Sequence, residues 1–473
     1  MMSAIIADNI FRGYDLRGQI PVELNDEGAY ALGLAYAAWL GQRRINEAVI
    51  VGDNRTHTEA LKTQFTQGML DGGINVTDTG LGLVYFMYFG QYLWQIKGGV
   101  SVSASHNPKE YNGFKLAVGF SDTMVTEEIL EFKKLVKSGK AAKSNHPGTL
   151  VKKEIFPAYL ADLHRKFRNQ FNFKIVIDCG NGTPGKFLPE ILRSFGCQII
   201  EQNTSLDGNY PLGTPDPTEA DYLNRLAAGV KTNHADLGVC YDPDGDRLGI
   251  VDGDGTKIWN DVLVALFARD VLEFLPGSPI VFNVLCSKLV KDTVVAAGGK
   301  PVMWLTGHSF IKAKVKESRA PFGGELSGHF FFMDNWYGHD DAAYATLRLL
   351  AYLTRKQLSL KAAVGQLPPY FSSPEIKLGL ADEIKFAFIK DTLAPQLKTW
   401  WPQAETVEID GLRLDDTDQM LVVRASQNGP YLTIKFETKT QEQYDDLKLK
   451  LKNLFKSHEQ INWGYGVNTD AFD

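Results

Sequence analysis

The stretch FKIVIDCGNGTPGKFLPEILRSFGCQIIEQ, residues 173–202, carries the clearest structural signal in the chain. It opens with β-branched residues and runs into a loop of Asp, Gly and Asn, which is typical of a buried strand. The middle predicts a helix that ends at Gly196, because glycine readily adopts the left-handed conformation past a helix end. A second apolar run follows. Strand, helix and strand in series predict a βαβ unit in a mostly parallel sheet.

Two other parts of the chain repeat this order. AVIVGDNR begins at Ala48 and precedes a helical pattern and a second apolar run, and PIVFNVLCS begins at Pro279 and does the same. With the unit at Phe173, the repeats start about 125 and then 105 residues apart, which is a common domain size. We therefore expect an α/β protein with three similar α/β domains, whose sheets are mixed and mostly parallel.

The C-terminal part has a different pattern. VEIDGLRLD, QMLVVRAS and YLTIKFETKT predict strands joined by turns, and QEQYDDLKLKLKNLFK (441–456) predicts an amphipathic helix. Length alone predicts about three domains at ~150 residues each, and this pattern adds a C-terminal α+β domain. The predicted domains are residues 1–148, 149–253, 254–368 and 369–473.

Composition excludes several classes of protein. The 473 residues include 50 Lys and Arg against 56 Asp and Glu, a net charge of −6. Without a basic excess to neutralise phosphates, we expect no nucleic-acid partner. The 44% hydrophobic content argues against disorder. The apolar run AYALGLAYAAWL (29–40) is shorter than the ~18 residues that a membrane span needs, so we expect no membrane association.

The cysteines indicate a reducing compartment. Cys179, Cys197, Cys240 and Cys286 lie in or beside apolar runs, and no two of them form a C-x-x-C pair. Buried, reduced thiols are the simplest interpretation. The N-terminus MMSAIIADNIF has no basic segment of the kind that starts a signal peptide. Together these features predict a cytoplasmic protein.

Ligand sites in α/β sheets lie beyond the carboxyl ends of strands, so the loops there are the candidates for chemistry. The first loop lies within GGVSVSASHNPKEYNGFK (98–115) and offers Ser105, His106 and Lys115. A nucleophilic serine needs a base or a strong electrophile nearby. A plain turn is the alternative, because Ser, Asn and Pro favour turns.

The second loop, in YDPDGDR (241–247), places Asp242, Asp244 and Asp246 at alternate positions after a buried strand. Carboxylates this close repel one another, and a divalent cation removes the conflict. We predict one Mg²⁺ per chain; an acidic surface turn is the alternative. An EF-hand is excluded because its glycine and glutamate positions hold other residues. Arg247 adds a guanidinium suited to phosphate.

Two more loops offer polar groups at predicted loop positions. GGELSGHFF (323–331) alternates Glu325, Ser327 and His329, a mixture that suits sugar hydroxyls. RASQNGPYL (424–432) could hold a phosphate through Arg424, Ser426, Gln427 and Asn428. Plain turns remain alternatives for both. GNGTPGKF (180–187) imitates an NTP-binding loop but has Phe187 where a hydroxyl must ligate Mg²⁺, which disfavours an ATP-dependent kinase.

These loops, in this order, resemble the α-D-phosphohexomutase family over essentially the whole chain. The opening FRGYDLRG (11–18) is similar to that family's N-terminal segment, SASHNP and DPDGDR are specific signatures, and GELSGH resembles the phosphomannomutase/phosphoglucomutase subgroup. The resemblance implies that the four domains surround one central cleft. Several positions depart from the family pattern. Leu285 stands where related enzymes often carry Lys, Asn428 stands where the phosphate loop commonly has Thr, Pro243 replaces a frequent Gly, and TGLGLVYFM (79–87) lacks a common Thr-Pro.

The resemblance also implies a role for each candidate residue. Ser105 would carry the phosphoryl group and help to bind Mg²⁺, and Lys115 and His329 would be acid/base candidates. The implied catalytic set is Ser105, Lys115, Arg247, His329, His106 and Arg17; the metal set is Ser105, Asp242, Asp244 and Asp246; and the substrate set is Tyr14, His308, Glu325, Ser327, Arg424, Ser426, Gln427 and Asn428.

The activity implied is the interconversion of hexose 1-phosphate and hexose 6-phosphate, for mannose and/or glucose. It would run through a phosphoserine enzyme and a hexose 1,6-bisphosphate, which would also be the activator. The partner would be a small phosphosugar, and we expect a monomer or a weak dimer. A phosphoglucosamine or other hexose phosphate mutase and a non-catalytic phosphosugar-binding relative are the alternatives.

Overall fold

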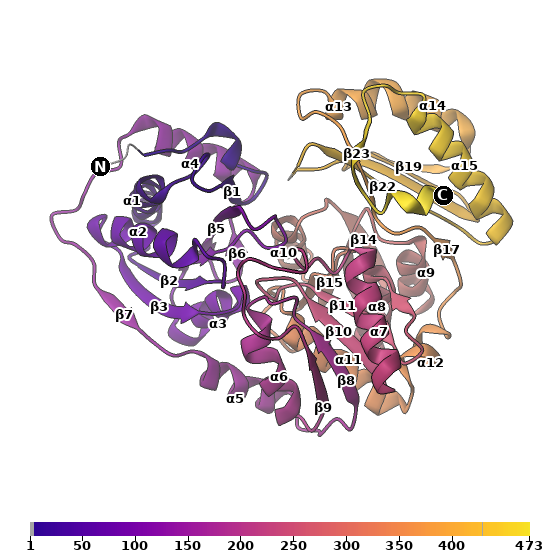
Figure 1. The fold of residues 1–473 in the computed structure, drawn as a ribbon, viewed down its shortest axis with the longest axis horizontal. Coiled ribbons are helices and arrows are strands. Elements are labelled where there is room, and N and C mark those ends of the chain that lie inside the picture. Colours follow the sequence, from indigo (N-terminus) through magenta and orange to yellow (C-terminus); the bar gives the residue numbers. More distant parts are fainter. Residues whose placement is uncertain (1–3, 428) are drawn as a thin grey trace.

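The computed structural model describes residues 4–427 and 429–473. Four sheets, each covered by helices, follow one another along the described chain (Figure 1). The predicted fold class is confirmed: three α/β domains precede a fourth, α+β domain. The cysteines are buried and unpaired, as predicted. No helix within residues 4–427 and 429–473 combines the length and apolar character that crossing a membrane requires.

The first domain is built on a sheet of parallel strands with antiparallel strands at one edge. The sheet order is β1 (Leu16–Gln19), β5 (Tyr111–Gly119), β4 (Gly98–Val102), β2 (Glu47–Gly52), β3 (Asn75–Leu81) and β7 (Leu150–Lys152), with β6 (Asp122–Thr123) on β5. The helical segments are η1 (Asp8–Ile10), α1 (Asp26–Gln42), α2 (Thr58–Asp71), α3 (Val84–Trp94) and α4 (Thr126–Ser138).

The second and third domains use shorter sheets. The second sheet runs β12 (Lys257–Ile258), β11 (Leu248–Asp252), β10 (Leu237–Tyr241), β8 (Lys174–Asp178) and β9 (Gln198–Gln202), with helices α5 (Phe156–Lys166), α6 (Pro184–Ser194) and α7 (Ala220–Asn233). The third runs β14 (Lys300–Trp304), β13 (Pro279–Asn283), β15 (Phe322–Gly324) and β16 (Phe330–Phe332), with helices α8 (Asn260–Phe274), α9 (Lys288–Ala296), α10 (His308–Glu317), α11 (Ala342–Lys356) and α12 (Leu360–Val364).

These sheets share one arrangement of strands. Three parallel strands are followed by an antiparallel neighbour, in the orders β3-β2-β4-β5, β9-β8-β10-β11 and β14-β13-β15-β16. In each domain a predicted site loop joins the last parallel strand to the antiparallel one: residues 103–110, 242–247 and 325–329. The repeat predicted from sequence therefore places three site loops at equivalent positions.

Strand pairing extends past two of the predicted domain limits. β7 lies beyond residue 148 and still pairs with β3, because the chain leaving the first domain runs along the open edge of its sheet. β12 lies beyond residue 253 and pairs with β11 across a short turn.

The fourth domain is an antiparallel sheet with helices on one face. The sheet order is β19 (Glu405–Val407), β20 (Leu412–Asp415), β21 (Gln419–Ala425), β22 (Tyr431–Thr438), β18 (Ile376–Gly379) and β23 (Asn462–Val467), with β17 (Phe371–Ser372) also on β22. The helical segments are α13 (Lys385–Ala387), the π-helical turn η2 (Phe388–Leu393), α14 (Ala394–Trp400), α15 (Gln441–Lys456) and η3 (Thr469–Phe472). The bounds of α15 match the predicted amphipathic helix.

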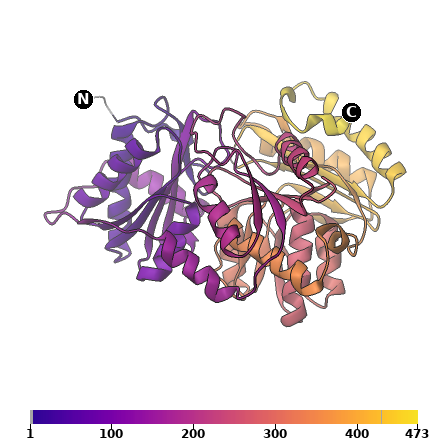
Figure 2. The ribbon, with the colours of Figure 1, turned by 60° about the horizontal axis from the view of Figure 1, so that its bottom comes forward.

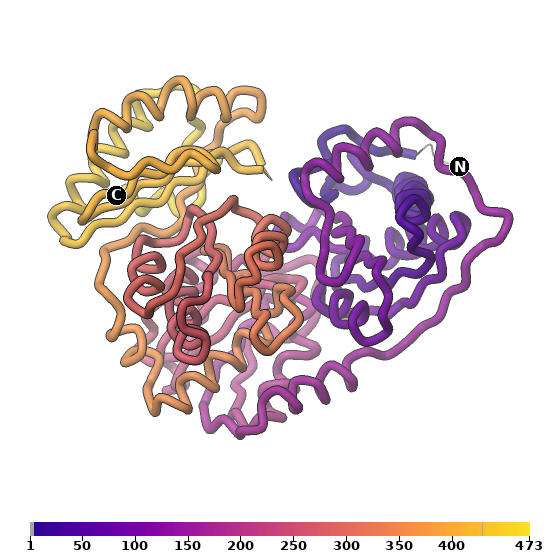
Figure 3. The backbone as a smooth tube through the Cα atoms, turned by 180° about the vertical axis from the view of Figure 1, so that it is seen from behind, coloured from indigo at the N-terminus to yellow at the C-terminus, as the bar shows by residue number. Residues whose placement is uncertain are grey.

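Packing joins the first three domains more closely than the fourth. The Phe86 ring of α3 lies 5.2 Å from Tyr159 of α5 and 5.0 Å from Phe187 of α6, within one apolar core that extends into the third domain. The fourth domain has an apolar core of its own. In Figures 2 and 3 it lies against the middle of the chain, away from most of the N-terminal domain.

Alternation along the strands gives the fourth sheet two unlike faces. In β22, Leu432, Ile434 and Phe436 point into the core of the fourth domain, whereas Lys435 points toward the third domain and lies 3.0 Å from Asp261. On the same polar face, the buried Arg413 donates hydrogen bonds to the carbonyl oxygens of residues 284 and 286, at 2.6 and 2.5 Å. Polar contacts, together with Met420 and Val422 of β21, which belong to the apolar core of the preceding domains, therefore hold the fourth domain in place.

Replacing Arg413 by Met tests this docking. The change removes both hydrogen bonds and leaves the buried Asp415 carboxylate, 3.0 Å from the guanidinium, without its partner. Breaking a buried pair costs about 3–5 kcal/mol, so thermal unfolding should begin well below the wild-type temperature. Lys439→Met is the matched control, because its ion pair with Asp418 is exposed and worth at most about 1 kcal/mol. Equal melting of the two variants would contradict the assignment.

Candidate active site

The loop after β4 presents Ser105 to the second domain. The Ser105 hydroxyl donates a 2.7 Å hydrogen bond to Asp242, and its backbone N–H donates to the Ser103 hydroxyl at 2.8 Å. Ser105 has φ of +49°, a left-handed conformation that costs a non-glycine residue about 1–3 kcal/mol and is concentrated at functional sites. The strained backbone of this loop thus directs the Ser105 hydroxyl toward the acidic loop of the second domain.

The acidic loop after β10 brings its three carboxylates together. Asp242, Asp244 and Asp246 are buried, and each offers an oxygen within 4.8 Å of the others. Burial and the two neighbouring carboxylates raise the pKa of Asp242 well above its ordinary value. One oxygen each of Asp244 and Asp246 has no hydrogen-bond partner within the described residues. Hard oxygens without partners fit a divalent cation.

Lys115 of β5 supplies the compensating charge from the first domain. Its ammonium donates to Asp246 at 2.6 Å and to Asp244 at 3.0 Å. Burial opposes the charged form of Lys115, but these carboxylates outweigh it and raise its pKa. Burial would likewise raise the pKa of Asp244, and the Lys115 ammonium overcomes this and lowers it. Lys115 is therefore a charged group at the base of the site.

Arg17 of β1 lies beside the serine loop. Its guanidinium donates to Asp15 at 2.6 Å and to the Asn107 side chain at 2.8 Å. The other Asp15 oxygen lies 3.5 Å from Nε2 of His308. Asp15 therefore orients a cation from the first domain and an imidazole from the third. His106 is next to the serine, with Nδ1 3.2 Å from the Ser105 hydroxyl.

Arg247 and His329 connect the second and third domains. Nε of Arg247 donates to Nε2 of His329 at 3.1 Å, and Nδ1 of His329 lies 3.0 Å from Asp340. Asp340 is also 3.2 Å from the buried Lys312 ammonium. An imidazole with a carboxylate on one nitrogen is the usual arrangement of an oriented histidine.

The remaining predicted residues line a small cavity of about 60 Å³. Glu325 accepts a 2.7 Å hydrogen bond from the Gly307 N–H, and burial raises the pKa of its carboxyl. Nε of Arg424 donates to Asp410 at 2.9 Å. Predicted residues in the lining are Tyr14, His106, Arg247, His308, Glu325, Ser327, His329, Arg424, Ser426 and Gln427. The predicted residue Asn428 lies outside the described residues.

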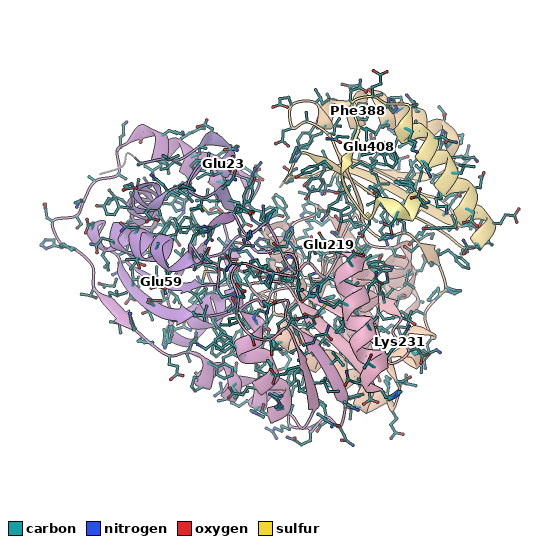
Figure 4. All side chains as sticks on the ribbon, in the orientation of Figure 1. Glu23, Glu59, Glu219, Lys231, Phe388 and Glu408 are labelled. Carbon is teal, nitrogen blue, oxygen red and sulfur yellow. The ribbon has the colours of Figure 1, made fainter. Side chains whose placement is uncertain are left out.

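A second cavity of about 810 Å³ adjoins the first and shares His106, Lys377 and Tyr431 with it. It opens between the first, second and fourth domains, the region where Figure 4 labels Glu219. Ligand pockets typically measure about 300–1,000 Å³. The small cavity alone cannot contain a sugar phosphate, and the two together can.

Several residues of this cleft are absent from the predicted set. Asp15, Asp216 and Asp340 orient predicted residues, and Lys377 and Thr433 line the small cavity. Asp15 lies inside the quoted segment FRGYDLRG, so that motif contained the signal. Thr433 is a polar member of the apolar/polar alternation in a predicted strand (Leu432, Thr433, Ile434), which is a signal for a polar face. Lys288, which lies three residues after Leu285, is not among the residues that line the two cavities, and its ammonium pairs with Asp292 at 3.2 Å.

Comparison with known proteins identifies the family. Three family models match consecutive parts of the chain: phosphoglucomutase/phosphomannomutase α/β/α domain I over residues 8–141, domain II over 157–255 and domain III over 259–371. A phosphomannomutase/phosphoglucomutase of Pseudomonas aeruginosa is 36% identical over 95% of this chain and 96% of its own length. A phosphoglucomutase of Neisseria gonorrhoeae is 34% identical over 97% and 99%.

Solved structures agree with the sequence matches. The crystal structure of a phosphoglucomutase/phosphomannomutase family protein from Burkholderia thailandensis superimposes with a TM-score of 0.86 at 30% identity, covering 96% of this chain and 98% of that one. The chain is therefore a member of the phosphoglucomutase/phosphomannomutase family of α-D-phosphohexomutases.

Proposed function

We propose that this protein interconverts hexose 1-phosphate and hexose 6-phosphate, with mannose and/or glucose as the sugar. The observation that carries the proposal is the contact of Ser105 with the acidic triad, surrounded by cations. Phosphoryl transfer depends mainly on positioning and charge neutralisation. Ser105 is held 2.7 Å from Asp242, and Arg17, Lys115 and Arg247 provide positive charge from two domains. The names of the relatives cover both mannose and glucose phosphates.

The reaction cycle starts with phospho-Ser105. Its phosphoryl group passes to the free 1- or 6-hydroxyl of a bound hexose phosphate, which gives up its proton, and the Ser105 oxygen leaves and takes up a proton. The resulting 1,6-bisphosphate turns within the cleft and presents its other phosphate, which Ser105 takes back. The larger cavity gives this intermediate room to turn, and Arg424 of the fourth domain holds the phosphate that is not reacting.

Proton transfer falls to groups around the serine loop. The attacking sugar hydroxyl loses its proton in the transition state, and a positioned acid/base group typically contributes about 10²–10⁴-fold. His329 is oriented by Asp340 and faces the cleft beside Arg247. We propose that His329 accepts the proton of the attacking sugar hydroxyl. Lys115 and Arg17 stabilise the negative charge of the phosphoryl group during its transfer.

The residues present also fit a bound Mg²⁺. The unpartnered oxygens of Asp244 and Asp246, with Asp242 and an oxygen of the phosphorylated Ser105, would hold it. Bound there, it would act as a Lewis acid toward the transferring phosphoryl group. One chain supplies the serine, the acidic triad and the surrounding cations, which supports our proposal that the protein acts as a monomer or a weak dimer.

The activity is tested directly with sugar phosphates. Mannose 1-phosphate, glucose 1-phosphate and glucosamine 1-phosphate are each supplied with Mg²⁺ and a trace of the matching hexose 1,6-bisphosphate. We expect conversion of the mannose and glucose compounds to their 6-phosphates. If only glucosamine 1-phosphate is converted, the substrate is an amino sugar phosphate and the proposed mannose or glucose specificity is wrong. If none of the three compounds is converted, the mutase activity is refuted.

The phosphoserine is tested by intact mass. Wild-type protein treated with hexose 1,6-bisphosphate should carry one phosphoryl group, and Ser105→Ala should carry none and lose at least about 10³-fold in turnover, because the cycle then has no carrier. Ser103→Ala serves as the matched control and should still be phosphorylated. If the Ser105→Ala variant still carries the phosphoryl group, then a residue other than Ser105 is phosphorylated.

Removal of Mg²⁺ gives a third test. Chelation with EDTA should lower turnover by at least about 10²-fold, since several kcal/mol of charge stabilisation are lost, and added Mg²⁺ should restore it. Calorimetric titration with Mg²⁺ should show one site per chain in the wild type and weaker binding in Asp244→Asn. Unchanged affinity in that variant would contradict the assigned ligands.

A further inference from the structure

The polar face of the fourth sheet carries a row of three side chains at the cleft. Arg424 of β21 is directly opposite Thr433 of β22, and Thr433 is directly opposite Lys377 of β18. Directly opposed residues share a face of the sheet. Neighbouring strands lie about 4.8 Å apart, so the two cationic residues start about 10 Å apart. Long side chains at that separation can converge on one anion above the threonine.

Thr433 at the middle of this row has an unused hydroxyl. The residue is 1% exposed, and its Oγ1 has no hydrogen-bond partner within the described part of the chain. Buried polar groups are almost always paired, so an exception calls for a ligand or a functional explanation. Thr433 lines the same small cavity as Arg424 and Lys377. It is placed to donate to an anion bound between them.

Lys377 brings a positive charge that faces the cleft. Its side chain is 12% exposed, and its ammonium lies 3.8 Å from Asp216, beyond hydrogen-bond distance. Asp216 also lies 3.7 Å from the Arg247 guanidinium. The carboxylate therefore stands between two cations, one from the second domain and one from the fourth.

Other lysines of the same region are committed to structural contacts. The Lys435 ammonium lies on the same face, 3.0 Å from Asp261 and 2.7 Å from the Ser372 hydroxyl, where it holds the fourth domain on the third. Lys385 donates to the carbonyl oxygens of Ser426 and Gly429 and supports the phosphate loop from behind. Lys377, in contrast, lines both cavities.

We propose that Lys377 and Thr433 complete, with Arg424, the site that holds the non-reacting phosphate of the hexose. The inference rests on the proposed function and adds residues from the sheet to those of the loop at 424–428. A phosphate dianion accepts several hydrogen bonds and requires charge neutralisation, and the row supplies one guanidinium, one hydroxyl and one ammonium. Both residues bind substrate and neither takes part in bond making.

Kinetics separate this role from a chemical one. Lys377→Met should raise the KM for glucose 1-phosphate or mannose 1-phosphate at least about tenfold, and Thr433→Val should raise it about threefold to tenfold. The kcat of both should stay within about threefold of wild type, and Lys377→Arg should recover most of the affinity. Lys439→Met, an exposed lysine of the same domain, should leave KM unchanged.

Thr433→Val separates phosphate binding from structural support of Asp216, because valine preserves the side-chain shape and position 433 makes no contact with Asp216 that would be lost. A KM within twofold of wild type in both variants would overturn the proposal. A fall in kcat at constant KM would also overturn it, since the residues would then act on the reacting phosphoryl group. A lower melting temperature with unchanged KM would mean that Lys377 only supports Asp216.

Binding measurements keep this test independent of turnover. Calorimetric titration with glucose 6-phosphate should give a Kd at least about tenfold weaker in Lys377→Met than in wild type. If wild type binds glucose 6-phosphate but does not convert hexose phosphates, the proposed function fails, and the variant's weaker Kd alone supports the site. If wild type is active and the Kd is equal in the variant, the site fails and the function stands. Absence of both binding and turnover would refute both.

Discussion

The contact between the Lys115 ammonium and the carboxylates of Asp244 and Asp246 is the constraint on which the rest of the site depends. Three buried carboxylates in one loop repel one another, and removing them from water costs several kcal/mol per charge. Lys115 is buried and lies 2.6 and 3.0 Å from two of them. Because the lysine and the aspartates come from different domains, neutralising the acidic loop requires the first and second domains to pack together. The same packing brings Ser105 to Asp242.

The shared strand order explains why the functional loops meet. In each of the first three domains, the last parallel strand turns into an antiparallel neighbour, and the connecting loop leaves the sheet at its carboxyl edge. One domain uses that loop for a hydroxyl, the next for carboxylates and the third for groups that suit a sugar. Repetition of one fold thus supplies three different chemistries to one cleft, and the apolar core around α3 fixes the loops relative to one another.

Sequence predicted best what is local. The βαβ repeats, the helix at 441–456 and the site loops each lie within a short window, and the structure shows the loops together. The carboxylates that orient them were not predicted, because Asp340 reaches His329 and Asp216 reaches Arg247 only through folding. The pairing register of the strands could not be predicted from the sequence either. Nothing in the sequence says that Lys377 and Arg424 flank Thr433, since the helical segments α13, η2 and α14 and the strands β19 and β20 lie between positions 377 and 424.

The fourth domain shows how one alternation serves both stability and binding. In β22, Leu432, Ile434 and Phe436 fill the apolar core, whereas Thr433 faces the cleft and Lys435 faces the third domain. A shift of pairing by one residue would move Thr433 into the core and expose Ile434 to the cleft. Core packing therefore fixes the register that aligns Arg424, Thr433 and Lys377. A chain of net charge −6 can accordingly present a cationic face to an anionic sugar, because the sheet separates its charged residues from its core.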